Sequence, residues 1–189
     1  MCLSVWINRG NRLMGFACFF VFTLVFFLGL PVTTDAAFFG RSDVETVKKG
    51  VLGLDKSTTI GNALGYYDYI KSPQWSSFED KQKRKVVQFK APLDQVKIAK
   101  AIVSDTVLKT LIADKKSILY SVQWSLVIQF RILPNDKFDV GYIGFENNKG
   151  KDERGDINNL KRIYKNEPTL HLSMGDSLLT VQMKAYEAE

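Results

Sequence analysis

The clearest pattern in the chain is a regular alternation of apolar and polar residues within residues 117–133. Val127 is the only apolar residue on the otherwise polar side of that alternation. Successive side chains of a strand point to opposite faces of the sheet, so this pattern predicts a long strand with one buried face. The apolar positions are Val122, Trp124, Leu126, Ile128, Phe130 and Ile132.

Turn residues on the C-terminal side of this strand predict a β-hairpin. Residues 134–137 read Pro-Asn-Asp-Lys, which favours a tight reversal into a second strand over residues 138–146. Gly141 and Gly144 interrupt that second strand, so we expect a bulge there. A shorter strand is expected near residues 84–90, where Pro92 would end it.

Helical spacing of apolar residues appears in three other segments. Residues 57–70 begin with three candidate cap hydroxyls and carry apolar residues at a 3.6-residue period, and Pro73 follows them. Gly61 and Gly65 lie four apart on one face of this predicted helix, where they would let another backbone or an aromatic ring approach. Residues 94–114 predict a second amphipathic helix. A third helix is expected from Asp156, as its cap, to about residue 165.

The tail shows a short alternation on both sides of a turn signal. Leu170, Leu172 and Met174 precede Gly175-Asp176, and an apolar alternation follows, so we predict a C-terminal hairpin. The apolar residues after the turn are Leu179, Val181 and Met183. The 189 residues suit one domain of ordinary size. The fold class we expect is α+β, with two or three helices packed on one face of an antiparallel sheet, preceded by an N-terminal signal segment. The expected divisions are 1–36 for the signal segment, 37–56 for a lead-in segment, and 57–189 for the single domain with its C-terminal hairpin.

The N-terminal segment has the pattern of a secretory signal peptide. Arg9 and Arg12 precede an uncharged, phenylalanine-rich stretch over residues 15–30, and small residues follow Pro31. That stretch is short for a membrane span, which needs about 20 residues. Two alternatives remain: cleavage after Ala36, or retention as a signal anchor with membrane association through residues 15–30. Both place the domain outside the cytosol, in the periplasm or at the cell surface, or anchored in the inner membrane.

Composition narrows the chemistry that the exported part can perform. Both cysteines, Cys2 and Cys18, fall inside the signal segment, so the exported part would have no disulfide and no thiol chemistry. The net charge of +6 is typical of proteins that bind nucleic acid or anionic membranes. Export argues against a nucleic-acid partner. The basic run at residues 81–85 fits a solvated turn that guards the next strand against aggregation, or attraction to an anionic surface.

Candidate catalytic and metal-binding residues are few. His171, the single histidine, lies between two leucines of the alternating tail, so we expect it to face solvent on the polar side of its strand. The acidic loop at residues 152–156 lacks the spacing of a calcium loop and contains Arg154, so we interpret it as a flexible turn plus a helix cap. The chain has no nucleophile elbow, no P-loop and no zinc-protease motif. We therefore expect no catalytic residues, no metal site and no cofactor.

Aromatic residues are the more suggestive feature. Trp75, Phe78 and Trp124 are expected to form core between helix and sheet. Tyr66 and Tyr69 point away from the apolar stripe of the helix predicted over residues 57–70. Together with Lys71 they would form an exposed patch of the kind favoured at protein interfaces, so Tyr66, Tyr69 and Lys71 are our candidate partner-contact residues.

Several short motifs resemble a domain family of bacterial exported and membrane-anchored proteins. The motifs are Val47-Lys48-Lys49-Gly50, Thr59-Ile60-Gly61-Asn62-Ala63, Trp75-Ser76-Ser77-Phe78 and Val87-Gln88-Phe89, and the resemblance spans roughly residues 44–165. The order of helix and sheet is also similar to envelope lipoproteins of the β-lactamase-inhibitor-like type. That resemblance implies a small α+β binding or assembly module and supplies no catalytic residue. The chain departs from both patterns because it has no lipid-bearing cysteine and has additional segments at residues 94–114 and 169–189.

The sequence thus predicts a non-catalytic exported binding or assembly module of the bacterial cell envelope that contacts another envelope protein. The alternatives are a membrane-tethered accessory subunit that keeps its N-terminal helix, and a small hydrolase. The partner's identity and the oligomeric state stay open.

Overall fold

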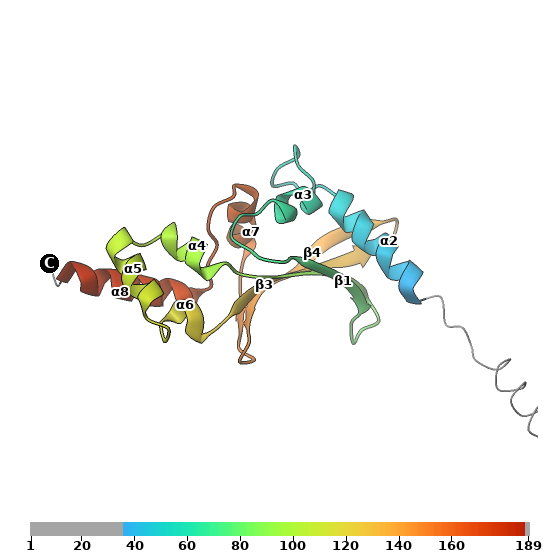
Figure 1. Cartoon of the computed structure of the whole chain (residues 1–189). Coiled ribbons are helices and arrows are strands. Elements are labelled where there is room, and N and C mark those ends of the chain that lie inside the picture. Colours follow the sequence, from blue (N-terminus) through green and yellow to red (C-terminus); the bar gives the residue numbers. More distant parts are fainter. Residues whose placement is uncertain (1–35, 188–189) are drawn as a thin grey trace, which may run out of the picture. The chain divides into compact units, whose positions relative to one another are not determined.

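A computed structural model describes residues 36–187. The signal segment predicted over residues 1–36 therefore lies outside the described residues, apart from Ala36. Residues 37–187 lie within one compact unit. Its centre is a five-stranded antiparallel sheet in the order β1–β2–β3–β4–β5 (Figure 1). The strands are β1 (Gln74–Glu79), β2 (Lys85–Pro92), β3 (Trp124–Leu133), β4 (Lys137–Asn147) and β5 (Asp152–Arg154). The α+β class and the antiparallel sheet are confirmed.

The alternation within residues 117–133 gives the sheet one apolar and one polar face. Strand β3 pairs Phe130 with Val87 and Ile128 with Phe89 of β2, and these side chains lie in one buried cluster. On the opposite face most cross-strand neighbours are polar, apart from the buried Val86 and Val127. Gln129 donates to Gln88 at 2.9 Å, and ion pairs join Lys90 to Glu146 and Arg131 to Asp139. A polar face whose side chains satisfy one another is typical of the solvated side of an antiparallel sheet.

The hairpin of β3 and β4 follows the sequence prediction closely. The loop between the strands is residues 134–136, in which Asn135 and Asp136 both have positive φ, a conformation that asparagine and aspartate adopt more readily than most residues. The register shifts opposite Gln129 and Phe130, where Tyr142 and Val140 are their partners and Gly141 is the extra residue. The predicted bulge is confirmed at Gly141, where an added Cβ would lie 2.9 Å from the Arg131 side chain.

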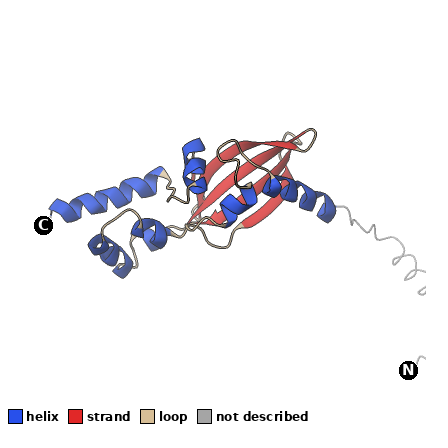
Figure 2. Cartoon of the chain, turned by 90° about the horizontal axis from the view of Figure 1, so that it is seen from above, coloured by secondary structure: helices blue, strands red, loops and turns tan. Residues whose placement is uncertain are grey.

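Residues 36–187 contain seven helices rather than two or three, and three of them lie on one side of the sheet (Figures 1 and 2). These three are α2 (Ala36–Lys49), α3 (Ile60–Gly65) and α7 (Ile157–Tyr164). They contribute buried side chains to the cluster on the apolar face of the sheet, namely Val47, Ile60, Leu64, Leu160 and Ile163. Much of the lead-in predicted over residues 37–56 is therefore helical.

Helix α3 is shorter than the helix predicted over residues 57–70. Thr59 caps it as expected, accepting a hydrogen bond from the Asn62 amide, but it ends at Gly65. Two glycines in six residues weaken helix propagation. Gly61 lies against α2, where an added Cβ would be 3.0 Å from the Lys48 carbonyl oxygen, whereas Gly65 has open space around it. The close approach predicted for this glycine pair thus occurs at one of its two members.

The remaining helices are α4 (Gln95–Lys100), α5 (Asp105–Ala113), α6 (Ile118–Ser121) and α8 (Leu172–Glu187). The single helix predicted over residues 94–114 is divided because Ser104 has extended backbone and caps a new helix at the Val107 amide. Helix α5 packs against α8, and the Gln182 side chain of α8 accepts a hydrogen bond from the Ser104 amide at 2.8 Å.

The predicted C-terminal hairpin is wrong, because residues 172–187 form the single helix α8. Gly175 and Asp176 lie inside this helix instead of forming a turn. Met174, Leu178, Val181 and Ala185 recur at helical spacing and pack into or against the core. The apolar residues of the tail are compatible both with strand alternation and with helical spacing. In the structure the helical spacing holds, because four side chains that recur every three or four residues pack together. The edge strands β1 and β5 were not predicted.

Candidate functional site

The three candidate contact residues lie in residues 66–71, which we call the tyrosine segment and which form the first part of the connection from α3 to β1. Tyr66 follows the last residue of α3 and is 79% exposed. Tyr69 is half-buried against the core, with its ring 5.5 Å from that of Tyr67. Lys71 is exposed and pairs with Asp94 at 3.3 Å. The structure thus places Tyr66 and Lys71 at the surface and turns Tyr69 partly inward.

The tyrosine segment is fixed to the rest of the fold by a buried ring. Tyr67 is 3% exposed, and its hydroxyl donates to the Glu167 carbonyl at 3.1 Å and accepts from the Thr169 amide at 2.8 Å. Burial raises the pKa of the Tyr67 phenol above its usual value. Next to it, the Asp68 amide donates to the Asn166 side-chain oxygen at 3.0 Å, and the Asn166 side-chain nitrogen donates to the Asp68 carboxylate at 2.7 Å.

The other side of the tyrosine segment is held by the end of β2 and by α4. The Lys71 amide donates to the Pro92 carbonyl, and the Asp94 amide donates to the Tyr69 carbonyl, each at 2.8 Å. The Lys97 side chain reaches the Asp68 carbonyl at 3.2 Å. Tyr66 therefore projects from a backbone that is hydrogen-bonded to two separate parts of the fold.

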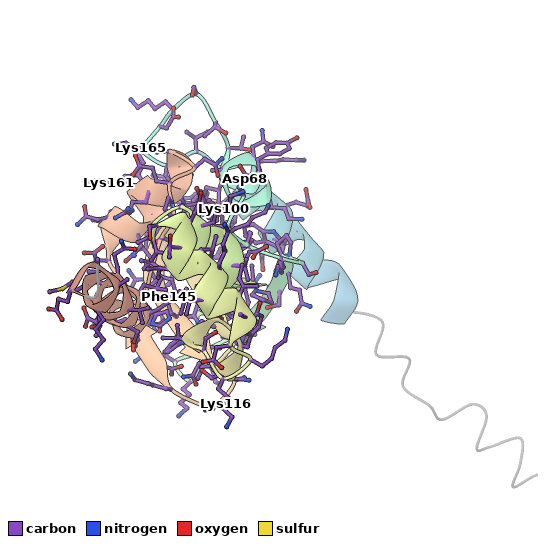
Figure 3. All side chains as sticks on the ribbon, turned by 60° about the vertical axis from the view of Figure 1, so that its left-hand side comes forward. Asp68, Lys100, Lys116, Phe145, Lys161 and Lys165 are labelled. Carbon is purple, nitrogen blue, oxygen red and sulfur yellow. The ribbon has the colours of Figure 1, made fainter. Side chains whose placement is uncertain are left out.

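Basic side chains of α7 lie on the same upper side of the molecule as Asp68 in Figure 3, which labels Lys161 and Lys165. These two lysines line a cavity of about 410 Å³ together with Tyr164 and residues 53–55. Burial, and then the charge of Asp55, raise the pKa of the Tyr164 phenol to about 12. The Tyr164 hydroxyl is buried and has no hydrogen-bond partner within the described residues.

His171 is buried, which contradicts the prediction that it faces solvent. The residue is 2% exposed, and its ring stacks on Trp124 with the centroids 3.7 Å apart. Phe145, which is labelled near the middle of the molecule in Figure 3, lies 5.9 Å from it. The misprediction has the same origin as the hairpin: His171 immediately precedes α8, so the leucine spacing around it does not describe a strand.

The two ring nitrogens of His171 have different surroundings. Nδ1 accepts a hydrogen bond from the Met174 amide at 3.1 Å, which makes His171 the N-cap of α8. The same Nδ1 lies 3.3 Å from a carboxylate oxygen of Glu153 on β5. Nε2 has no hydrogen-bond partner among residues 36–187. Burial, only partly offset by Glu153, lowers the pKa of His171 to about 4, so the ring is neutral at pH 7.

The loop predicted over residues 152–156 is part of the sheet. Its first three residues form β5, which pairs with β4. Asp156 caps α7 as predicted, by accepting hydrogen bonds from the Asn158 and Asn159 amides. Within residues 36–187 no three or more histidine, cysteine or acidic side chains come together as metal ligands would.

The basic run at residues 81–85 forms the turn between β1 and β2 and the start of β2. Arg84 pairs with Asp80 at 2.6 Å, and Lys85 pairs with Asp43 of α2 at 3.4 Å. The hydrogen bonds to Arg84 lower the pKa of Asp80. These contacts agree with the interpretation of this run as a solvated turn.

No protein-family model, curated protein or solved structure matches this chain. The resemblance to exported and membrane-anchored domains therefore stays a prediction. None of the helices in the described part of the chain is long and apolar enough to span a membrane.

Proposed function

We propose that this protein is a non-catalytic, exported binding or assembly module of the bacterial cell envelope, and that it contacts another envelope protein through the tyrosine segment. The observation that carries the proposal is the combination at Tyr66 of high exposure and a fixed backbone. A large ring that is 79% exposed is held on a segment whose neighbours on both sides are hydrogen-bonded to the fold.

Preorganisation is what makes such a side chain useful in binding. Ordering side chains and loops at an interface costs free energy, and a segment that is ordered beforehand avoids that cost. Tyrosine combines a large apolar ring with a polar hydroxyl and has few rotatable bonds, which is why interface hot spots are rich in it. The ammonium of Lys71 on the same segment favours a partner with acidic or carbonyl groups beside the pocket that takes the ring.

The position of His171 argues against the small-hydrolase alternative in its histidine-based form. A general base must come within hydrogen-bond reach of the substrate. The side chain of His171 has no exposed surface, and its accepting nitrogen is occupied by the Met174 amide. This ring therefore serves the fold and not a substrate.

Site-specific photo-cross-linking in the cells that make the protein tests the proposal. A photoreactive phenylalanine analogue replaces Tyr66 in one variant of the protein and Tyr120 in a second variant. Tyr120 is the control because it is an exposed tyrosine on α6 that the proposal does not use. We expect a discrete cross-linked envelope protein from position 66 and none from position 120.

Substitution of Tyr66 provides a complementary test, in which recovery of the partner should be lost. Tyr66→Ala should reduce recovery of that same partner at least tenfold, as expected for a hot-spot residue worth more than about 1.4 kcal/mol, whereas Tyr120→Ala should leave recovery unchanged. Equal cross-linking at both positions, or full recovery with Tyr66→Ala, would show that the tyrosine segment is not the contact.

A further inference from the structure

A single nitrogen of His171 faces two partners that it cannot serve at once. Nδ1 is 3.1 Å from the Met174 amide nitrogen, which needs an acceptor, and 3.3 Å from Glu153 Oε2, which as a carboxylate needs a donor. A ring nitrogen of histidine offers either a lone pair or a proton, never both. The protonation state of Nδ1 therefore decides whether α8 keeps its N-cap.

We propose that His171 is a proton-operated latch: when Nδ1 gains a proton, it gives up the Met174 amide and turns to Glu153, which releases the first turn of α8 and loosens the tyrosine segment. The second part of this inference rests on the proposed function, because it makes the latch a regulator of the partner-contact site.

The connection to the tyrosine segment runs through residues 166–171. At one end of this stretch, His171 caps α8. In its middle, the Thr169 amide donates to the Tyr67 hydroxyl, and Thr169 Oγ1 accepts from the Asn159 side chain at 2.8 Å. At its other end, Asn166 holds the Asp68 amide and carboxylate. Only four residues thus separate the latch from Asn166, the anchor of Asp68, and movement of His171 pulls on the hydrogen bonds that fix Tyr67.

The charges around the His171 ring have opposite effects on its pKa, and burial of the ring is the largest effect. Glu153 on β5 favours the protonated ring. Lys151, which precedes β5 and lies 2.8 Å from the Glu153 carboxylate, disfavours it. Arg154 and Arg162 contribute two more positive charges to an open cavity of about 400 Å³ that His171 also lines, and Asp156 contributes one negative charge. The apolar rings of Trp124 and Phe145 give no compensation, and the Nε2–H, which the neutral ring already carries, has no acceptor within residues 36–187 that would stabilise the positive charge.

The consequence is a change of population with pH. In the closed state the pKa of His171 is lowered to about 4, below its ordinary value of 6.5. In the open state the protonated Nδ1 faces the Glu153 carboxylate, which removes that lowering. Protons therefore bind the open state preferentially, and the ratio of open to closed molecules rises by up to about tenfold per pH unit as the pH falls from 6.5 to 4, roughly 300-fold in all. An exported protein meets the pH of its surroundings, so it is exposed to such changes.

NMR titration of the protein as isolated from its cells tests the latch without any partner. His171 is the only histidine in the chain, so its ring signals need no further assignment, provided that no histidine tag is present. At pH 7 we expect the proton on Nε2 and an accepting Nδ1. On acidification we expect the ring to titrate with a midpoint well below 6.5, and the amide signals of Met174, Thr169 and Asp68 to move with the same midpoint.

Two variants give matched controls. His171→Asn retains a side-chain acceptor that can cap α8 but cannot titrate in this range, so the amide signals of Met174, Thr169 and Asp68 should lose their pH step. Glu153→Gln removes the group that favours protonation, so the midpoints of the ring and of the three amides should fall together. Two results with the wild-type chain would by themselves disprove the latch. One is a ring that titrates near 6.5, and the other is Thr169 and Asp68 amide signals that do not move while the ring titrates.

The cross-link at position 66 separates this inference from the proposed function. Between pH 7 and pH 4 its yield should fall at least severalfold in the wild-type chain and stay constant with His171→Asn. A cross-link whose yield is the same at both pH values would support the contact site and contradict its regulation by the latch. No cross-link at any pH would defeat the proposed function, while the NMR titration would still decide whether the latch exists.

Discussion

At the scale of one residue, His171 makes the stability of the fold depend on pH. Its folded-state pKa of about 4 is lower than the 6.5 of a solvated histidine, so between these values the unfolded chain binds more protons than the folded one. Stability from this residue is complete above about pH 6.5 and is lost as the pH falls toward 4. The loss is on the order of 3 kcal/mol when the difference of 2.5 in pKa is taken in full.

Urea denaturation at a series of pH values measures this effect. The free energy of unfolding of the wild-type chain should fall between pH 6.5 and 4 by more than that of His171→Gln, whose side chain approximates the size of histidine without its charge change. Hydrogen bonds lower the pKa values of Asp55 and Asp80. The stabilisation that these carboxylates contribute to the fold is lost at more acidic pH, and this loss is the same in both chains. Parallel curves for the two chains would show that the ring is not buried in its neutral form.

The same residue shows where inference from sequence reaches its limit. The leucines beside His171 suggested a strand, and neighbouring residues alone could not reveal that Trp124 and Phe145, far away in the sequence, enclose its ring. Tyr66 was predicted correctly to be exposed, although it follows the last residue of α3 instead of lying on a longer helix. Tyr69 was not, since its burial depends on packing against Tyr67 after α3 has already ended.

At the scale of elements, the strand alternation was the most informative pattern, whereas the long helical pattern over residues 94–114 did not reveal the break at Ser104. The alternation within residues 117–133 specified β3 and its buried face, and the turn residues specified the hairpin with β4. Strand β5 has three residues, which is too short to show any period, and is held by its pairing with β4. The tail alternation was also short, and the helical spacing of the same residues fits the core better.

Helix α8 can be tested with two neighbouring leucines, because one is buried and the other is exposed. The hairpin prediction buries Leu179, whereas α8 buries Leu178 completely and leaves Leu179 55% exposed. Leu178→Ala should therefore lower the free energy of unfolding by about 2–5 kcal/mol through loss of apolar burial and a residual cavity. Leu179→Ala should change it by less than about 0.5 kcal/mol.

Thermal or urea unfolding of both chains measures the difference. Far-ultraviolet circular dichroism before unfolding checks that the helix content of each variant is unchanged. If the two substitutions cost the same, or if the cost at Leu179 is greater, the tail does not pack as α8.

At the scale of the whole molecule, the domain does not depend on what becomes of the N-terminal segment. Helix α2 begins at Ala36, and its packing contacts with the core, Val44 and Val47, lie well beyond that residue. A chain cut after Ala36 and a chain that keeps its leader would therefore share the same core, the same tyrosine segment and the same latch. Under the proposed function, the two alternatives differ only in whether the module diffuses or stays at the membrane.

Processing of the exported chain separates these alternatives. We expect N-terminal sequencing and intact mass of the mature protein to show Ala37 as its first residue, because Thr34 and Ala36 supply the small side chains that a signal peptidase requires. Ala36→Phe should block the cut and hold the full-length chain in the membrane fraction. Ala37→Val, one residue beyond the predicted cut, should be processed normally. A wild-type chain recovered from membranes at full length would favour the tethered subunit, and one recovered from the cytosol with its leader intact would contradict export altogether.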